Sequence, residues 1–208
     1  MSSGVIYLNH GTKHLARLVV SLYSLRKVYA GPVTVLESGE ESAKDIVCRI
    51  AHDPRINVGV QQFPFTRLKR HSCYVNKASL WRHSPYDPTL LLDADTVVAK
   101  DPSPLFELAE KERGGFVVTR FSNWHTGGKI IRGRLEQWRK VRDRKLDVPN
   151  LLHKALMAPR GAVNTGVVCW RKNSEFLYAW ERLTQAGWKC SFSDEVACQC
   201  LLPSYEHM

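Results

Sequence analysis

Residues 90–98 read "LLLDADTVV", and the fold assignment of this chain depends on them. Three leucines and two valines favour a strand within residues 88–99 that is buried on both faces. This strand runs directly into Asp93 and Asp95, which are one residue apart. Residues i and i+2 of a strand point to the same side, and a turn at the strand end can let both reach one point. The stretch therefore predicts a strand that ends in paired carboxylates.

Two carboxylates at one point repel each other unless a cation neutralises them. Hard divalent ions such as Mg²⁺ and Mn²⁺ bind carboxylate oxygens and share their remaining positions with phosphates. We therefore expect Asp93 and Asp95 to hold a metal ion that bridges the protein and a diphosphate. The alternative is that one aspartate caps the next segment and the other is solvated, but the apolar strand in front of the pair favours the metal.

Short apolar segments alternate with segments of helical spacing along most of the chain. This alternation predicts an α/β fold with a mostly parallel, doubly wound central sheet flanked by helices, in one domain that spans residues 1–208. Residues 119–150 break the rhythm and favour a loop that leads into a basic helix. Besides 88–99, strands are expected at 4–9, 31–38, 56–63 and 161–173, and helices at 13–29, 40–52, 73–84 and 174–188.

Composition narrows the classes of protein that fit. The chain has 208 residues, of which 44% are apolar and 24% charged, as in ordinary globular proteins. No segment has the apolar length of a transmembrane helix, and the first residues lack the pattern of a signal peptide. Six scattered cysteines are too few for a disulfide scaffold in a chain of this length. These features predict a cytoplasmic protein.

Positive charge is concentrated in one region. The net charge is +10, and residues Lys129–Arg160 hold ten Lys or Arg against three Asp or Glu, an excess of seven. Such an excess favours an anionic partner, namely a nucleotide, a nucleic acid or a membrane surface. The alternative is a solvated helix face, which is the usual explanation of a charge run.

Four blocks together resemble glycosyltransferases of the GT-A fold, especially those of family 8. The first block is "YVNKASLWRHSPYDPTLLLDADT", in which "LLLDADT" resembles the D-x-D motif of that family and "YVNKASLWRHS" the helix ahead of the motif strand. "VNTGVVCWRKN" resembles the family's Asn-x-Gly strand, and "SDEVACQCLL" its Asp-Gln or Asp-Glu helix start. "VIYLNHGTKHLARLVVSLYSLRK" resembles the first strand and helix, which receive the nucleotide base. The blocks occur in the family's order over nearly the whole chain.

The resemblance implies a role for each matching residue. Asp93 and Asp95 would hold Mn²⁺ or Mg²⁺ and, through it, the donor diphosphate, with Lys77 close by. For three of these residues a purely structural role is the alternative: Lys77 would be a solvated lysine, Asn164 would hold a turn, and Asp194 would cap the start of a helix. The remaining implied residues are Asn9, His10 and Gly11 at the base and ribose, Asn164 and Gly166 in the sugar pocket, and Asp194 and Glu195 facing the transferred sugar.

These assignments imply a reaction in which a nucleotide-diphosphate sugar, a UDP-sugar by default, gives its sugar to an acceptor hydroxyl. The metal and Lys77 would stabilise the charge on the leaving diphosphate. Asp194 or Glu195 would stabilise the electron-poor sugar carbon or act as general base on the acceptor. Family 8 implies that the anomeric configuration is retained, although the sequence by itself leaves retention and inversion open.

Three alternatives for the partner remain open at the level of the sequence. The acceptor is a saccharide or a similar hydroxyl compound, which we place first. It is otherwise DNA bound through Lys129–Arg160, with a hydroxylated base flipped out of the duplex. The third alternative is a non-catalytic nucleotide or nucleic-acid binding module.

One departure from the family concerns the third metal ligand. Family members usually continue beyond the "DEVACQCLL" block, often with a histidine that completes the metal site. The present sequence ends at "PSYEHM", where His207 is next to the last residue. We therefore expect either that a C-terminal segment is missing from this sequence or that the site uses fewer protein ligands.

Overall fold

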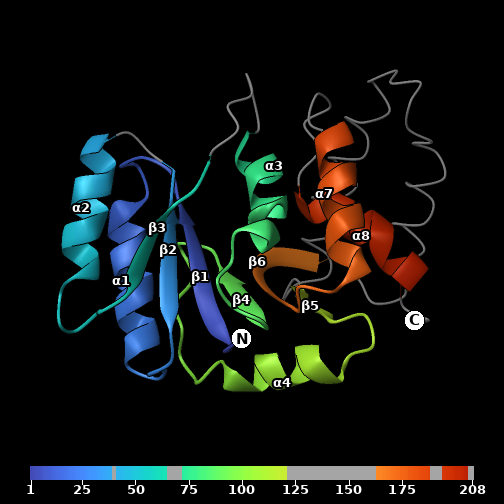
Figure 1. Ribbon diagram of the computed structural model, residues 1–208, viewed down its shortest axis with the longest axis horizontal. Helices are drawn as coiled ribbons and strands as arrows, with labels where there is room; N and C mark the ends of the chain where they lie inside the picture. The colour runs from blue at the N-terminus through green and yellow to red at the C-terminus, as the bar shows by residue number, and fades with distance from the viewer. Residues whose placement is uncertain (39–40, 65–71, 121–162, 188–193, 206–208) are drawn as a thin grey trace. The chain divides into compact units, whose positions relative to one another are not determined.

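A computed structural model describes residues 1–38, 41–64, 72–120, 163–187 and 194–205. The predicted alternation of strands and helices is present along the chain (Figure 1). The strands are β1 (Gly4–Asn9), β2 (Val33–Glu37), β3 (Gly59–Gln62), β4 (Thr89–Leu92), β5 (Phe116–Arg120) and β6 (Val163–Trp170). The helices are α1 (Leu15–Arg26), α2 (Glu41–Ala51), α3 (Ser72–Ala78), α4 (Ser103–Lys111), α7 (Glu175–Gly187) and α8 (Asp194–Tyr205), with a short 3₁₀ helix at Leu80–Arg82.

The strands form one six-stranded sheet in the order β3-β2-β1-β4-β6-β5. The β2–β3, β1–β2 and β1–β4 pairs are parallel, whereas β6 runs antiparallel to β4. Strands β1, β2 and β3 are added in one direction across the sheet, whereas β4 lies on the other side of β1. The prediction of a mostly parallel α/β sheet is therefore confirmed, and β6 makes the sheet mixed.

The chain divides into two compact units. The first contains residues 1–65, 82–117 and 166–172, and the second contains residues 66–81, 118–165 and 173–208. Strands β5 and β6 each pass from one unit into the other.

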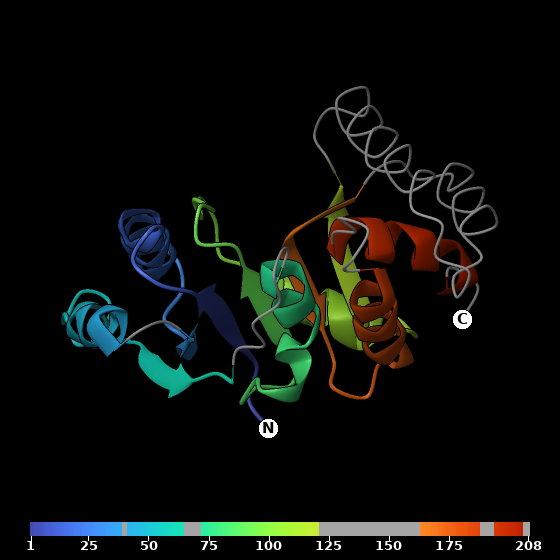
Figure 2. The same cartoon turned by 90° about the horizontal axis from the view of Figure 1, so that it is seen from above.

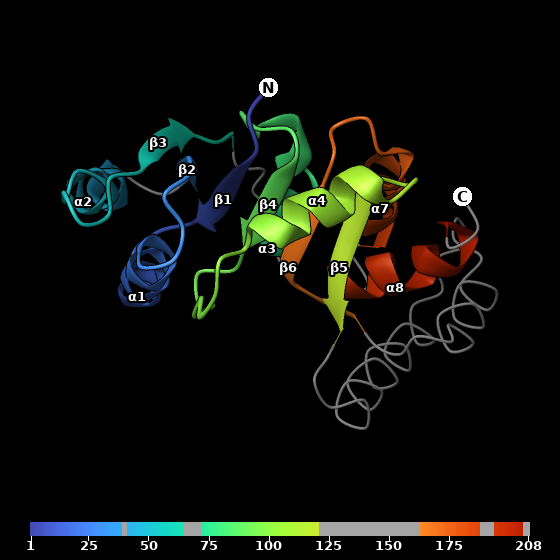
Figure 3. The same ribbon diagram turned by 90° about the horizontal axis from the view of Figure 1, so that it is seen from below.

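The core of the first unit lies on one face of β1, β2 and β4. Alternate residues of these strands, such as Val5, Tyr7 and Val35, pack with Leu18 and Leu22 of α1. Helices α1, α2 and α4 flank these strands (Figure 3). Burial raises the pKa of Tyr7 to about 12, although its hydroxyl accepts a hydrogen bond from Ser21 Oγ at 3.0 Å. Helix α1, which lies within the helix expected at residues 13–29, thus packs its buried side chains Leu18, Leu22 and Leu25 into this core.

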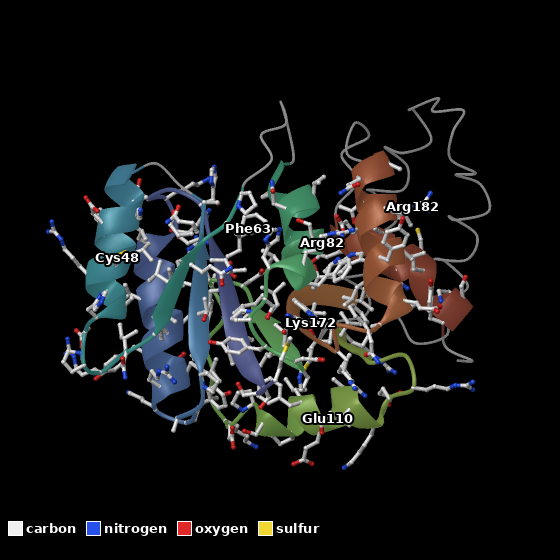
Figure 4. All side chains as sticks on the ribbon, viewed as in Figure 1. Cys48, Phe63, Arg82, Glu110, Lys172 and Arg182 are labelled. Carbon is white, nitrogen blue, oxygen red and sulfur yellow. The ribbon has the colours of Figure 1, made fainter. Side chains whose placement is uncertain are left out.

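A smaller set of contacts holds the other parts of this unit. The Phe63 ring packs edge-on against the His83 ring, with 4.9 Å between their centroids. The backbone N–H of Lys172 donates to Asp87 Oδ1 at 3.1 Å, at the start of β4. Phe63 and Lys172 are labelled in Figure 4. The first contact joins the residue after β3 to the residue after the 3₁₀ helix, and the second joins the segment after β6 to the segment before β4.

In the second unit, α3, α7 and α8 pack against one another (Figure 2). The Trp180 indole is buried at the centre of this packing, and its Nε1 donates to the backbone O of Asp194 at 2.8 Å. Trp81 Nε1 donates to Glu181 Oε2 at 3.0 Å, and the Phe176 ring meets the Tyr205 ring edge-on. Two indole N–H groups therefore tie α7 to α8 and to the residues after α3.

Several element boundaries differ from the expectations. The strand expected over residues 88–99 ends at Leu92, because Thr96 N donates to Asp93 O at 3.0 Å and turns the chain. Val97 is consequently 68% exposed. The helix expected over residues 73–84 is interrupted after Ala78, where the backbone N and the hydroxyl of Ser79 both donate to Asn76 O. Within the described residues, no helix combines the length and the apolar content needed to span a bilayer.

Candidate functional site

The Asp93–Asp95 pair occupies a turn at the carboxyl end of β4. Asp93 N donates to Gly166 O of β6 at 2.8 Å, and Asp93 O accepts from Thr96 N. Asp93 is half-buried and Asp95 is exposed, with 62% of its side chain accessible. The expected strand is thus followed by a turn that contains both aspartates. Gly166, which was expected in the sugar pocket, holds the backbone of the first aspartate.

Asp95 has a cationic neighbour that the sequence did not suggest. Arg17 Nη1, from the first turn of α1, lies 3.6 Å from Asp95 Oδ2. Both side chains are 62% exposed, so the pair is reached by solvent and by ligands. A solvated pair of this kind contributes about 0–1 kcal/mol to folding. Stability therefore does not account for an arginine at this position.

A second cluster lies where β1 and β2 end side by side. The strands are in parallel register, with Asn9 opposite Glu37. Asn9 Nδ2 donates to Glu37 Oε2 at 2.6 Å and to Gly11 O at 3.1 Å, and both Asn9 and Glu37 are buried. Both N–H groups of the amide are therefore used within the protein. Asn9 Oδ1, which is also buried, has no hydrogen-bond partner among the described residues.

The residues after Asn9 turn the chain at the surface. His10 Nδ1 lies 3.2 Å from Ser38 O and from Ser38 Oγ, and both the N–H and the Oγ of Ser38 donate to Asn9 O at 3.1 Å. Gly11 has a φ of +69°, a conformation that favours glycine. Asn9, His10 and Gly11, the three residues expected near the base and ribose, thus form one hydrogen-bonded edge with the end of β2.

A buried charged cluster lies in the second unit. Lys77 Nζ of α3 is 3.5 Å from Asp194 Oδ2, the first residue of α8, and their side chains are 13% and 3% exposed. Thr165 Oγ1 of β6 donates to the same carboxylate oxygen at 2.5 Å. Lys77 and Asp194, two of the predicted residues, are thus brought together. Thr165 is a third member that sequence reasoning missed.

The remaining predicted residues of this unit are more accessible. Glu195 follows Asp194 in the first turn of α8 and is half-buried. Asn164 is also half-buried, and its backbone O accepts from Thr119 Oγ1 at 2.9 Å. Gln199 Oε1 accepts from Val163 N at 3.0 Å, which fastens the start of β6 to α8. The side chains of Asn164 and Glu195 are therefore the predicted polar groups of this unit that a ligand can reach.

The donor chemistry of Asp93 and Asp95 fits a hard divalent ion. Two carboxylates with the remaining positions taken by phosphate and water are a common set for Mg²⁺. Within the described part of the chain, no group of three or more His, Cys, Asp or Glu side chains could form an all-protein metal site. Among the described residues, Asp93 and Asp95 are the two carboxylates that would hold the ion, with the remaining positions open to phosphate and water. His207 and the region Lys129–Arg160 lie outside the described residues.

Comparisons with known proteins point to one type of fold. No family model matches the chain, and no curated protein matches its sequence. Mouse xyloside xylosyltransferase 1, in its apo form, has a similar structure with a TM-score of 0.66 and 14% identity, over 100% of this chain and 84% of that protein.

Two further solved structures have the same fold. The WbbM bifunctional glycosyltransferase has a TM-score of 0.61 and 13% identity, over 98% of this chain and 37% of its own. The galactosyltransferase LgtC, solved with donor and acceptor sugar analogues, has a TM-score of 0.59 and 15% identity, over 97% of this chain and 70% of its own. The chain therefore has the α/β fold of GT-A glycosyltransferases.

Proposed function

We propose that this protein is a metal-dependent glycosyltransferase that moves a sugar from a nucleotide-diphosphate sugar to an acceptor hydroxyl. The observation that carries the proposal is the position of Asp93 and Asp95, in a turn at the carboxyl end of β4. Ligands of open α/β sheets bind at this edge. The likeness of the fold to glycosyltransferase structures adds support.

In this proposal the first unit binds the nucleotide. Asn9, His10 and Gly11 lie at the carboxyl end of β1, beside the end of β2, and would contact the base and ribose. Asp93 and Asp95 would hold Mn²⁺ or Mg²⁺, and the bound ion would supply positive charge to the leaving diphosphate. Uridine remains the default base, on the family 8 resemblance of the sequence.

The second unit would supply the groups for sugar transfer. The two neighbouring acids differ in their exposure to ligands, since Asp194 is 2% exposed and Glu195 is half-buried. We therefore assign them different roles. Asp194 already accepts from Thr165 and pairs with Lys77, so we assign it to holding these groups in place. Glu195 would then be the carboxylate that faces the sugar carbon or takes the proton of the acceptor hydroxyl. Asn164 of this unit would line the sugar pocket, whereas Gly166, for which the family resemblance implies the same role, belongs to the first unit.

A saccharide is the acceptor that we propose. LgtC was solved with donor and acceptor sugar analogues, and xyloside xylosyltransferase 1 is named for a glycoside. The DNA alternative depends on Lys129–Arg160, which lies outside the described residues. No described contact favours it, and we do not propose it.

The test is thermal stability with a panel of nucleoside diphosphates, each with and without Mn²⁺. A ligand at a hundredfold excess over its Kd stabilises the folded state by about 2.7 kcal/mol, which raises the Tm by roughly 5–10 °C in a chain of this size. We expect one nucleotide to do this only with Mn²⁺, and the effect to disappear in Asp95→Asn.

Asp53→Asn is the matched control, because Asp53 is also an aspartate of the first unit paired with an arginine, Arg55, but follows α2 rather than β4. It should respond to the nucleotide as the wild type does. A metal-dependent shift that survives in Asp95→Asn would remove the proposed role of the aspartates. The absence of any nucleotide effect in the wild type would contradict the transferase proposal itself.

A further inference from the structure

The Arg17–Asp95 pair places a fixed positive charge beside the carboxylates proposed to bind the metal. We infer that Arg17 couples the binding of metal to the binding of diphosphate: it opposes the divalent ion when it binds alone and supports it when the diphosphate is present. This inference rests on the proposed function. It assigns a positioning and phosphate-binding role to Arg17, a residue to which the family resemblance gives no role.

The sign of the effect follows from the charges. With no diphosphate, the guanidinium of Arg17 already neutralises part of the charge on Asp95, and it repels a second cation that approaches the same oxygen. A diphosphate adds several negative charges at the metal. The same guanidinium then attracts the ligand, so that one residue weakens metal binding in the first case and strengthens ligand binding in the second.

The surroundings of Arg17 favour an anion. No acidic residue lies in the first turn of α1, and no side chain caps the start of the helix. The first N–H groups of a helix lack intrahelical partners and carry partial positive charge. Lys13 and His14, which precede the helix, are both exposed. Arg17 therefore adds to a positive region within reach of Asp95.

The side chain also suits the exchange of partners. At 62% exposure, Arg17 is not locked by packing, and it can leave Asp95 for a phosphate at little cost. A guanidinium binds phosphate oxygens in a bidentate manner, which the point charge of a lysine does not. Replacement by lysine should consequently preserve the repulsion of free metal but lose part of the diphosphate binding.

The experiment compares wild type, Arg17→Gln and Arg17→Lys in two measurements. Binding of Mn²⁺ alone is followed by the loss of the free-ion electron paramagnetic resonance signal, and binding of UDP at saturating Mn²⁺ by calorimetry. For Arg17→Gln we expect Mn²⁺ alone to bind about fivefold more tightly and UDP about tenfold more weakly, both at low salt. Salt at about 0.5 M should shrink both changes. Arg17→Lys should stay near wild type for Mn²⁺ alone.

Two controls separate failure of the inference from failure of the proposed function. Arg55→Gln removes another exposed arginine of the first unit, one that pairs with Asp53 at 2.6 Å, and should change neither affinity. Asp95→Asn should abolish Mn²⁺ binding. If Asp95→Asn has no effect, or if UDP does not bind the wild type, the proposed function fails and the inference fails with it. If Mn²⁺ binding needs Asp95 but both affinities are unchanged in Arg17→Gln, the inference alone is overturned.

Discussion

Lys77 Nζ lies 3.5 Å from Asp194 Oδ2, and both side chains are almost fully withdrawn from solvent. The pair joins α3 to the first residue of α8. Its charges also act on a neighbour. Burial raises the pKa of the Cys198 thiol well above its usual value, the charge of Asp194 raises it further, and that of Lys77 lowers it. The pair is therefore an internal feature of its unit as well as a part of the candidate site.

The first prediction concerns the stability of this unit. Lys77→Met should lower the free energy of unfolding by about 3 kcal/mol, because it leaves the Asp194 carboxylate buried without its cation. The double variant Lys77→Met/Asp194→Asn should recover part of the loss, since the unpaired charge is gone. Urea denaturation at pH 7 measures both values.

Lys111→Met is the control for this prediction. Lys111 pairs with Glu107 at 3.7 Å on the surface of α4, with side chains that are 76% and 67% exposed. Its replacement should change stability by no more than about 0.5 kcal/mol. A Lys77→Met variant that is as stable as Lys111→Met would mean that the buried pair contributes nothing to folding.

The sequence predicts the part of the fold that depends on regular apolar patterns. The strand expected at residues 4–9 coincides with β1, and the strands expected at 31–38 and 161–173 contain β2 and β6. No element is predicted for residues 101–118, which contain α4 and the first part of β5, and the loop expected from residue 119 begins inside β5, which ends at Arg120. Helix α4 buries only Phe106 and Ala109, and β5 is half-exposed at the edge of the sheet, so both give weak patterns.

The sequence predicts those site residues that lie together in one short motif. It does not predict contacts that form only when strands and helices pack against one another. Asp93 and Asp95 follow directly from an apolar strand that ends in acids. Glu37 has the same sequence pattern in "VTVLES", namely an acid at the end of a buried strand. Its pairing with Asn9 depends on the parallel register of β1 and β2, and Arg17 reaches Asp95 only through the packing of α1.

The second prediction concerns Arg26, whose guanidinium connects the end of α1 to two loops. It donates to Ile56 O and Gly31 O at 2.6 Å, to Asn57 O at 2.8 Å and to Tyr29 O at 3.3 Å. Burial lowers the pKa of Arg26. A lysine ammonium cannot reach four carbonyl groups in different directions. Arg26→Lys should therefore destabilise the protein by about 2 kcal/mol in urea denaturation.

Arg55→Lys provides the comparison for Arg26. Arg55 is 71% exposed at the side chain and contacts Asp53, two residues away. We expect the urea midpoint of this variant to stay at the wild-type value. Equal losses for the two substitutions would show that Arg26 holds the loops no more firmly than a solvated arginine does.

The third prediction concerns alkaline pH. Burial raises the pKa of the Cys200 thiol to about 12 from its ordinary value of 9.0. Because the folded state keeps this proton more tightly, the contribution to stability is complete below about pH 9 and is lost as the pH rises toward 12. Above pH 9 the stability of the wild type should therefore fall more steeply than that of Cys200→Ala, by about 1.4 kcal/mol per pH unit.

Urea midpoints at pH 7, 9 and 10 measure this difference in slope. Val196→Ala is the control, because it truncates another buried side chain of α8 without removing a titratable group. Its stability should be lower than that of the wild type at every pH but should follow the same slope. Parallel curves for the wild type and Cys200→Ala would contradict the prediction.

The last prediction concerns the Asn9–Glu37 hydrogen bond at the ends of β1 and β2. Glu37 Oε2 and Gly11 O accept from the two N–H groups of the Asn9 amide, so they fix its orientation and leave Oδ1 as the acceptor. Glu37→Ala should lose about 2 kcal/mol of stability and weaken nucleotide binding several-fold, because a buried donor is left unpaired and the amide is released.

Glu37→Gln separates the shape of this contact from its charge. Its amide oxygen can still accept from Asn9 Nδ2, so nucleotide affinity should stay within about twofold of the wild type, while stability falls by less than in Glu37→Ala. The measurements are urea denaturation and calorimetric titration with UDP and Mn²⁺ on the same samples. If Glu37→Ala loses stability but binds UDP as tightly as Glu37→Gln does, Glu37 supports the fold alone and does not orient Asn9 for the nucleotide.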